Sequence, residues 1–200
     1  MSLARGLERR LERLMDGIAA RLFGGKIHPV ELGERLVREA DLALTEGETG
    51  PVAPNRFEVT LGGVPADTDA VGSVQRELEA VVEETAFERG WRLEGPARVL
   101  ITVGGGAETS VRVAATVEAG DRPAWCKLLP AGDHELREVT HNRAIVGRSG
   151  TCDVHVADPE VSRRHALLWQ EVGAIWVADL GAANGTSING VPVQEPSPGA

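Results

Sequence analysis

Two turns in the C-terminal part of the chain carry residue types that suit phosphate binding. From Ala144 onward the cationic side chains are Arg148, Arg163 and Arg164, set against six acids. A guanidinium is permanently charged and planar, so it can hold a phosphate or carboxylate with two hydrogen bonds, and a nearby hydroxyl can donate another. Arg148 and Ser162 are suited to form such a pair. Taken singly, Arg148 could instead make a surface salt bridge and Ser162 could simply begin a turn.

The order and spacing of four motifs favour the phosphate site over these separate explanations. Gly147-Arg148 is followed by Ser162-x-x-His165, Asn184-Gly185-Thr186 and Asn189-Gly190. Together they resemble the forkhead-associated (FHA) domain, an all-β sandwich that binds phosphothreonine peptides. The resemblance extends over the C-terminal part of the chain and implies a binding function.

The resemblance also implies roles for single residues. Arg148 and Ser162 would bind the phosphate, Arg163 would support it by side chain or backbone, and Asn184 would hydrogen-bond the main chain of the bound peptide. For His165 we expect a buried imidazole that ties two loops together rather than a general base. The residues expected to have architectural roles are Gly147, His165, Gly185, Thr186 and Asn189.

The sequence departs from the family pattern just before Asn184. A Ser-Thr pair is common there, and this chain has Ala182-Ala183. Without a hydroxyl at Ala183, one contact to the peptide or phosphate is lost, and a neutral hydrogen bond contributes about 0.5–1.5 kcal/mol net. We therefore expect a lower affinity rather than an abolished site.

Composition limits the possible partners and compartment. The net charge of −9 disfavours bulk nucleic acid and anionic lipid, which both attract broad basic surfaces. Cys126 and Cys152 are too few for a disulfide scaffold and lack metal-ligand spacing, which predicts reduced thiols in a cytoplasm. No apolar run is long enough to cross a bilayer, so we expect no direct membrane insertion. We expect no metal and no cofactor.

Helical periodicity dominates the N-terminal part. Leucines and one isoleucine recur on one face over residues 3–22, which predicts an amphipathic helix ending at Gly24-Gly25. Its mixed charges favour packing on its own domain over binding a membrane or a second subunit. Pro29 suits the first turn of a second helix. The predicted buried stripe of that helix comprises Leu32, Leu36, Val37 and Ala40.

Alternating and glycine-rich segments follow. Residues 56–61 alternate strictly and predict a half-buried strand. Ser73 is a candidate cap for a third helix that Gly90 would end. Its apolar side would comprise Val74, Leu78, Val81, Val82, Thr85 and Phe87. Its glutamates predict a solvated face, and an acidic docking face is the alternative. Strands 98–103 and 110–117 are predicted to form a hairpin across Gly104-Gly105-Gly106.

These elements predict an α+β domain over residues 1–118. Phe23-Gly24-Gly25, Pro29-Val30-Glu31 and residues 53–57 resemble the N-terminal domain found beside FHA modules in actinobacterial signalling proteins encoded near Ser/Thr kinases and cell-envelope genes. The resemblance implies protein partners and no catalysis. A short linker, 119–123, is then expected before the sandwich.

Short strands with turn residues between them predict the sandwich over residues 124–200. We expect Trp169 and Trp176 in its core. Only ten residues follow Gly190, and Pro192, Pro196 and Pro198 are poor strand formers, so we expect the sandwich to be C-terminally incomplete. The predicted strands span residues 124–129, 135–140, 144–147, 153–156, 166–169 and 175–178.

The sequence thus predicts a non-catalytic phosphothreonine-binding adaptor, located in the cytoplasm and recruited to the inner face of the cell membrane by a partner. The family resemblance implies a membrane-bound Ser/Thr protein kinase and a partner in peptidoglycan synthesis or division. The alternative is a constitutive scaffold or oligomer formed through the N-terminal domain, with a weakened phosphate site. No Walker motif or nucleophile elbow suggests an enzyme. Candidate phosphoacceptors on the chain itself are Thr45, Thr49, Thr109 and Thr116.

Overall fold

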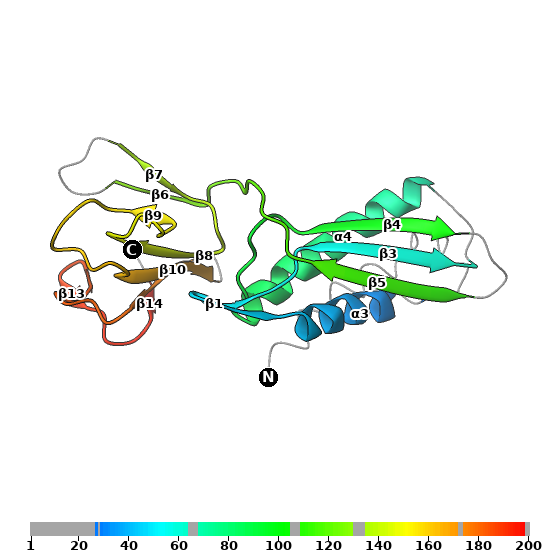
Figure 1. Ribbon diagram of the computed structural model, residues 1–200, viewed down its shortest axis with the longest axis horizontal. Helices are drawn as coiled ribbons and strands as arrows, with labels where there is room; N and C mark the ends of the chain where they lie inside the picture. Colours follow the sequence, from blue (N-terminus) through cyan, green and yellow to red (C-terminus); the bar gives the residue numbers. More distant parts are fainter. Residues whose placement is uncertain are drawn as a thin grey trace. The chain divides into compact units, whose positions relative to one another are not determined.

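The computed structural model describes residues 27, 29–63, 68–104, 109–129, 135–171 and 174–198. They group into two compact units, shown in Figure 1. Unit 1 takes in the chain up to Glu46 and from Pro51 to Gly120, and unit 2 takes in Gly47–Gly50 and the chain from Asp121 onward. The amphipathic helix predicted over residues 3–22 and the Phe23-Gly24-Gly25 motif lie outside the described residues.

Unit 1 is built on a three-stranded sheet with β3 at its centre. The strands are β3 (Arg56–Gly62), β4 (Arg98–Gly104) and β5 (Ser110–Thr116), in the order β4-β3-β5. β4 runs parallel to β3 and β5 antiparallel to it. The predicted hairpin between β4 and β5 is therefore wrong. Both strands pair with β3, whose alternate side chains Phe57, Val59 and Leu61 are fully buried.

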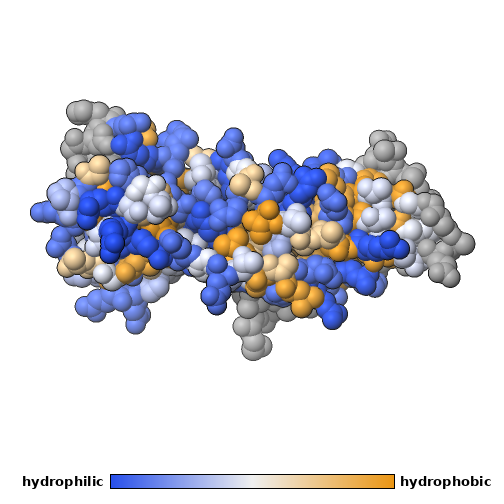
Figure 2. All heavy atoms as spheres, viewed as in Figure 1, coloured by the Kyte–Doolittle hydropathy of each residue, from blue (hydrophilic) through white to orange (hydrophobic). Residues whose placement is uncertain are grey.

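Two helices pack against these buried side chains. They are α3 (Pro29–Leu42) and α4 (Thr68–Glu88), and a small hairpin, β1 (Thr45–Gly47) and β2 (Gly50–Val52), follows α3. The predicted stripe of α3 is confirmed, since its four members are all buried in one core with β3. In Figure 2, polar and apolar residues are interspersed over the sheet strands on the face shown.

The ends of α4 correct one prediction and confirm another. Ser73 is not its cap, because the helix begins five residues earlier. Gly90 does end it: Gly90 N–H donates to the Phe87 carbonyl and Trp91 N–H to the Ala86 carbonyl, with φ +67° at Gly90. This is the Schellman arrangement, which favours glycine. Phe87 is 37% exposed rather than buried, and Ala86 takes the core position.

The acidic side of α4 is not a simple solvated face. Glu79 accepts a hydrogen bond from Val99 N–H at 3.1 Å and Glu83 one from Ala97 N–H at 2.9 Å, while Gln75 donates to the Val99 carbonyl at 2.7 Å. These side chains satisfy backbone groups along the outer edge of β4, where an exposed edge strand would invite pairing with another chain. The predicted solvated face is therefore corrected, because its glutamates are half-buried and two of them bond the backbone of β4.

Unit 2 is a β-structure around a five-stranded sheet in the order β14-β11-β10-β8-β9. Two-stranded hairpins, β6–β7 and β12–β13, accompany it. Its core joins Val139, Ala144, Val154 and Leu168, with Trp125 and Val177 packed against them. The strand bounds are β6 Cys126–Leu128, β7 Arg137–Val139, β8 Arg143–Gly147, β9 Val154–His155, β10 Ala166–Glu171, β11 Ala174–Asp179, β12 Ser187–Ile188, β13 Val191–Pro192 and β14 Ser197–Pro198.

Two expectations about unit 2 need correction. Pro192 and Pro198 do lie in strands: β13 pairs with β12, and β14 pairs with β11 at the edge of the sheet. Both strands are only two residues long and lie at edges, which is where proline is tolerated. Trp169 and Trp176 are half-buried rather than core residues, and their rings stack at 6.1 Å across β10 and β11.

Candidate functional site

Three loops of unit 2 meet in one surface. They follow β8 (residues 148–153), precede β10 (157–165) and follow β11 (180–186). Arg148 N–H donates to the Ser162 carbonyl at 3.0 Å, and Ser149 N–H to the Arg163 carbonyl at 3.1 Å. Ala183 N–H donates to the Ser162 hydroxyl oxygen at 3.0 Å. The structure therefore brings together the turns that contain the predicted phosphate-binding residues.

Gly147 permits the close approach of the first two loops. A Cβ atom at this position would lie 2.3 Å from the Arg163 carbonyl oxygen and 3.0 Å from the Arg164 Cα. Real Cβ atoms essentially never come so close to backbone atoms, so any side chain would force the loop containing Ser162 away. The architectural role predicted for Gly147 has this steric basis.

Arg148 is exposed at the rim of this surface. Its Nε donates to the Val161 carbonyl at 3.1 Å, which fixes the direction of the guanidinium. Its two terminal nitrogens make no hydrogen bond with any residue that the structure describes. A guanidinium that is oriented through one N–H and has its remaining donors free is ready to bind an anion.

Ser162 is held by groups on either side of it. Its N–H donates to His165 Nδ1 at 3.2 Å, and its Oγ accepts from Ala183 N–H. Because one acceptor site of the hydroxyl is used, its O–H is directed to donate elsewhere. The main chain of Ala183 thus contributes to the site although its side chain has no hydroxyl. His165 is half-buried rather than buried as predicted, and the hydrogen bond of its side chain lies within its own loop.

Asn184 joins the second and third loops. Its Nδ2 donates to the Glu160 carbonyl at 2.9 Å, which leaves the side-chain oxygen exposed as an acceptor for a peptide N–H. The two-residue turn after it, Asn189-Gly190, has φ values of +52° and +80° and joins β12 to β13. Positive φ at both positions is typical of the type I′ hairpin turn, for which Asn-Gly is the favoured pair.

Asp179, which was not among the predicted site residues, organises the third loop. Its carboxylate accepts from Gly181 N–H at 2.7 Å, Ala182 N–H at 3.0 Å and the Thr186 hydroxyl at 2.5 Å. The Thr186 hydrogen bond, followed by the two backbone bonds, lowers the pKa of Asp179 below its ordinary value. The sequence signal was Asp179-x-Gly181, since an aspartate commonly bonds the backbone two residues further on.

Asp179→Asn should destabilise unit 2 at neutral pH, because the amide carries no charge and its NH₂ group cannot accept from Thr186. A lowered folded-state pKa means that the carboxylate stabilises the fold above its unfolded pKa and loses this effect as the pH falls through the folded value. The difference in unfolding midpoint between wild type and variant should therefore be largest near neutrality and shrink below about pH 4. Urea unfolding at a series of pH values measures it; a difference that does not change with pH would contradict the assignment.

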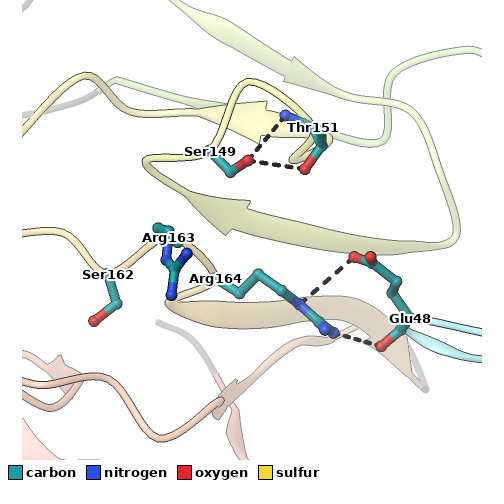
Figure 3. Close-up of a pocket in the computed structure, with 6 residues that line it drawn as sticks. All are labelled: Glu48, Ser149, Thr151, Ser162, Arg163 and Arg164. Atoms are coloured by element: carbon teal, nitrogen blue, oxygen red, sulfur yellow. Dashed lines mark hydrogen bonds and ion pairs between the residues drawn. The ribbon is translucent and has the colours of Figure 1, made fainter.

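A pocket of about 470 Å³ lies beside Ser162, lined also by Ser149, Thr151, Arg163, Arg164 and Glu48. Figure 3 shows the Arg163 side chain between those of Ser162 and Arg164. Arg164 is engaged by Glu48, which belongs to the same unit: Nη2 donates to the Glu48 carbonyl at 2.6 Å, and Nε lies 3.7 Å from its carboxylate. Glu48 and the two hydroxyls, Ser149 and Thr151, were not predicted from the sequence to belong to this surface.

Two other kinds of site were sought among the described residues. They contain no cluster of three or more His, Cys, Asp or Glu side chains able to hold a metal ion. No helix among them is long and apolar enough to cross a membrane. Cys126 and Cys152 are free thiols, and partial burial raises the pKa of both.

Comparison with protein-family models shows to which family the chain belongs. Residues 5–109 match the family model described as the FhaA N-terminal domain, which spans more than half of the 200 residues. The chain belongs to this family. Residues 144–199 match the FHA domain model, so the loops described above lie within an FHA domain. The FhaA N-terminal domain and FHA families are families of non-catalytic binding and adaptor domains.

Solved structures resemble each part of the chain in turn. An FHA domain from a study of phosphothreonine-dependent interactions is 28% identical over 37% of this chain and 76% of its own, with a TM-score of 0.34. The FhaA FHA domain, complexed with the intracellular domain of Rv3910, is 28% identical over 37% of this chain and 80% of its own, with a TM-score of 0.34. The N-terminal structure of Rv0020c is 28% identical over 51% of this chain and 81% of its own, with a TM-score of 0.42. No curated protein matches the chain.

Proposed function

We propose that this protein is a non-catalytic adaptor that captures phosphothreonine-containing proteins through its FHA domain, while unit 1 provides a second contact. The observation that supports this proposal is that donors with no partner among the described residues lie on loops that contact one another. The terminal nitrogens of Arg148 and the hydroxyl hydrogen of Ser162 belong to loops that are hydrogen-bonded to each other. Such donors are preorganised, so binding requires little reordering.

The chemistry of this surface suits a phosphorylated threonine. A phosphate ester carries about −1.5 to −2 charges at neutral pH and offers three acceptor oxygens. In this proposal Arg148 binds the phosphate through its terminal nitrogens, Ser162 donates its hydroxyl, and Arg163 supports the phosphate through its backbone. Asn184 accepts a hydrogen bond from the peptide main chain through its free side-chain oxygen.

The biological setting is proposed from the family relationship. A Ser/Thr protein kinase would create the ligand by phosphorylating a partner, and would thereby control assembly. The solved FhaA FHA domain is bound to the intracellular domain of Rv3910. We infer by analogy a cytoplasmic protein recruited to the inner face of the cell membrane, where it regulates cell-wall synthesis or division.

Titration calorimetry with a pool of phosphothreonine peptides and the same pool without phosphate tests the proposal. The phosphate should improve the dissociation constant by about a hundredfold or more, because two or more charge-assisted hydrogen bonds each contribute about 1.5–3 kcal/mol. Equal affinity for both pools, with the protein folded, would contradict it. Partners that stay bound after phosphatase treatment would instead support a constitutive scaffold acting through unit 1.

A further inference from the structure

We propose that the pocket lined by Ser149, Thr151, Arg163 and Arg164 is a second anion subsite, which takes an acidic or phosphorylated residue flanking the phosphothreonine in the same peptide. This inference rests on the proposed function, because the subsite acts on a peptide already held at Arg148 and Ser162. The pocket shares Ser162 with that site. Its volume of about 470 Å³ falls within the range of roughly 300–1,000 Å³ that is usual for ligand pockets.

One wall of the pocket is a pair of hydroxyls. Ser149 Oγ and Thr151 Oγ1 lie 2.9 Å apart, and Thr151 N–H donates to Ser149 Oγ at 3.3 Å. Each hydroxyl has one hydrogen, so the one that accepts within the pair keeps its own hydrogen to donate to a ligand. The dashed lines in Figure 3 mark these bonds. The pair therefore offers a hydrogen-bond donor at the pocket wall.

The opposite wall is cationic. Arg163 is exposed, and its guanidinium makes no hydrogen bond or ion pair with the residues that the structure describes. Arg164 is also exposed, but its Nη2 is bonded to the Glu48 carbonyl. This main-chain bond fixes Arg164 without neutralising it, because a carbonyl carries no formal charge. Two guanidinium groups and a hydroxyl donor around one pocket favour an anion.

Glu48 limits the strength of this subsite. Its carboxylate is 3.7 Å from Arg164 Nε and its side chain is 67% exposed, so it forms a loose ion pair at the pocket rim. The pocket thus keeps a net formal charge of +1, from two arginines and one glutamate. A ligand anion must compete with this carboxylate for Arg164, and removal of its charge should strengthen anion binding while the carbonyl continues to hold the arginine.

The test compares three kinds of peptide by titration calorimetry. They are a phosphothreonine peptide with neutral flanks, a series with glutamate at each flanking position in turn, and the same peptide with a second phosphate. The second anion should tighten binding about three- to tenfold, as expected for one exposed charge-assisted contact. Arg164→Gln should remove this gain and keep the affinity for the neutral-flank peptide. The Ser149→Ala/Thr151→Ala double variant should reduce the gain without changing the net charge.

Glu48→Gln supplies the opposite result. The improvement in the dissociation constant that the second anion gives should become about two- to fivefold larger in this variant. The exposed ion pair with Arg164 is lost, while the hydrogen bond from Arg164 to the carbonyl of residue 48 stays. Matched controls are Glu46→Gln, an exposed acid outside the pocket, and Arg112→Gln, an exposed cation of unit 1; neither should alter the gain. Raising the salt concentration should diminish the gain in the wild type.

Failure of the proposed function and failure of the subsite give different results. If the neutral-flank phosphothreonine peptide fails to bind the folded wild type, the proposed function fails and the subsite with it. If that peptide binds, but a second anion gives no gain at any position, or the gain survives Arg164→Gln, the subsite is refuted while the proposed function stands. A gain with the second phosphate only, and none with glutamate, would restrict the ligand to doubly phosphorylated peptides.

Discussion

Arg148→Ala is expected to weaken phosphothreonine binding by about a hundredfold or more, which corresponds to a loss of roughly 3 kcal/mol. The reason is that its terminal nitrogens are the permanently charged donors in the loop that follows Gly147, and they are free to make two bonds to one phosphate. The Nε bond to Val161 sets the direction of the group. Titration calorimetry against the phosphothreonine pool measures the effect.

A conservative variant and a distant control make this prediction specific. Arg148→Lys keeps the charge but loses the planar fork and the Nε bond, so it should recover only part of the affinity. Arg112→Ala removes an exposed cation from unit 1 and should leave binding within about twofold of wild type. Folding should be unchanged in each variant, because Arg148 and Arg112 are both exposed. Undiminished binding by folded Arg148→Ala would remove the central residue of the proposed site.

The motif residues could be predicted from sequence because either a local backbone conformation or a family pattern accounts for each residue type. Asn189-Gly190 occupies positions with positive φ, and Gly147 lies where a Cβ would collide with Arg163. The strands of unit 2 were also indicated, because turn-forming residues separate short strand-like segments. These features depend on neighbouring residues in the chain or belong to a family motif, so they can be recognised in the sequence.

Other features depend on contacts between distant residues and could not be predicted. The hairpin between β4 and β5 seemed to follow from their glycine-rich connection, yet both strands pair with β3, which is 42 residues from β4 in the register Arg56 to Arg98. Glu79 and Glu83 read as solvated charges, but their positions along β4 let them bond its backbone. The pairing of Arg164 with Glu48 spans 116 residues, and no local sequence pattern indicates it.

Gly147→Ala is the substitution expected to affect stability most. The new methyl group would lie 2.3 Å from the Arg163 carbonyl oxygen, which is backbone and cannot rotate away. The loop must shift, and the bonds from Arg148 N–H to Ser162 and from Ser149 N–H to Arg163 weaken with it. Overpacking and the loss of two hydrogen bonds together should cost about 3–4 kcal/mol of unit 2 stability.

Gly150→Ala is the matched control for this prediction, because a Cβ at Gly150 meets nothing within 4 Å. It should change stability by less than about 0.5 kcal/mol. Urea unfolding followed by near-UV circular dichroism reports mainly on unit 2, since three of the four tryptophans lie in it and Trp169 stacks on Trp176. Under conditions where Gly147→Ala is still folded, phosphothreonine binding should also fall, because displacement of the 162–164 loop separates Ser162 from Arg148. Equal stability and affinity in the two alanine variants would show that the loops can separate freely, and that the close approach at Gly147 does not position the site.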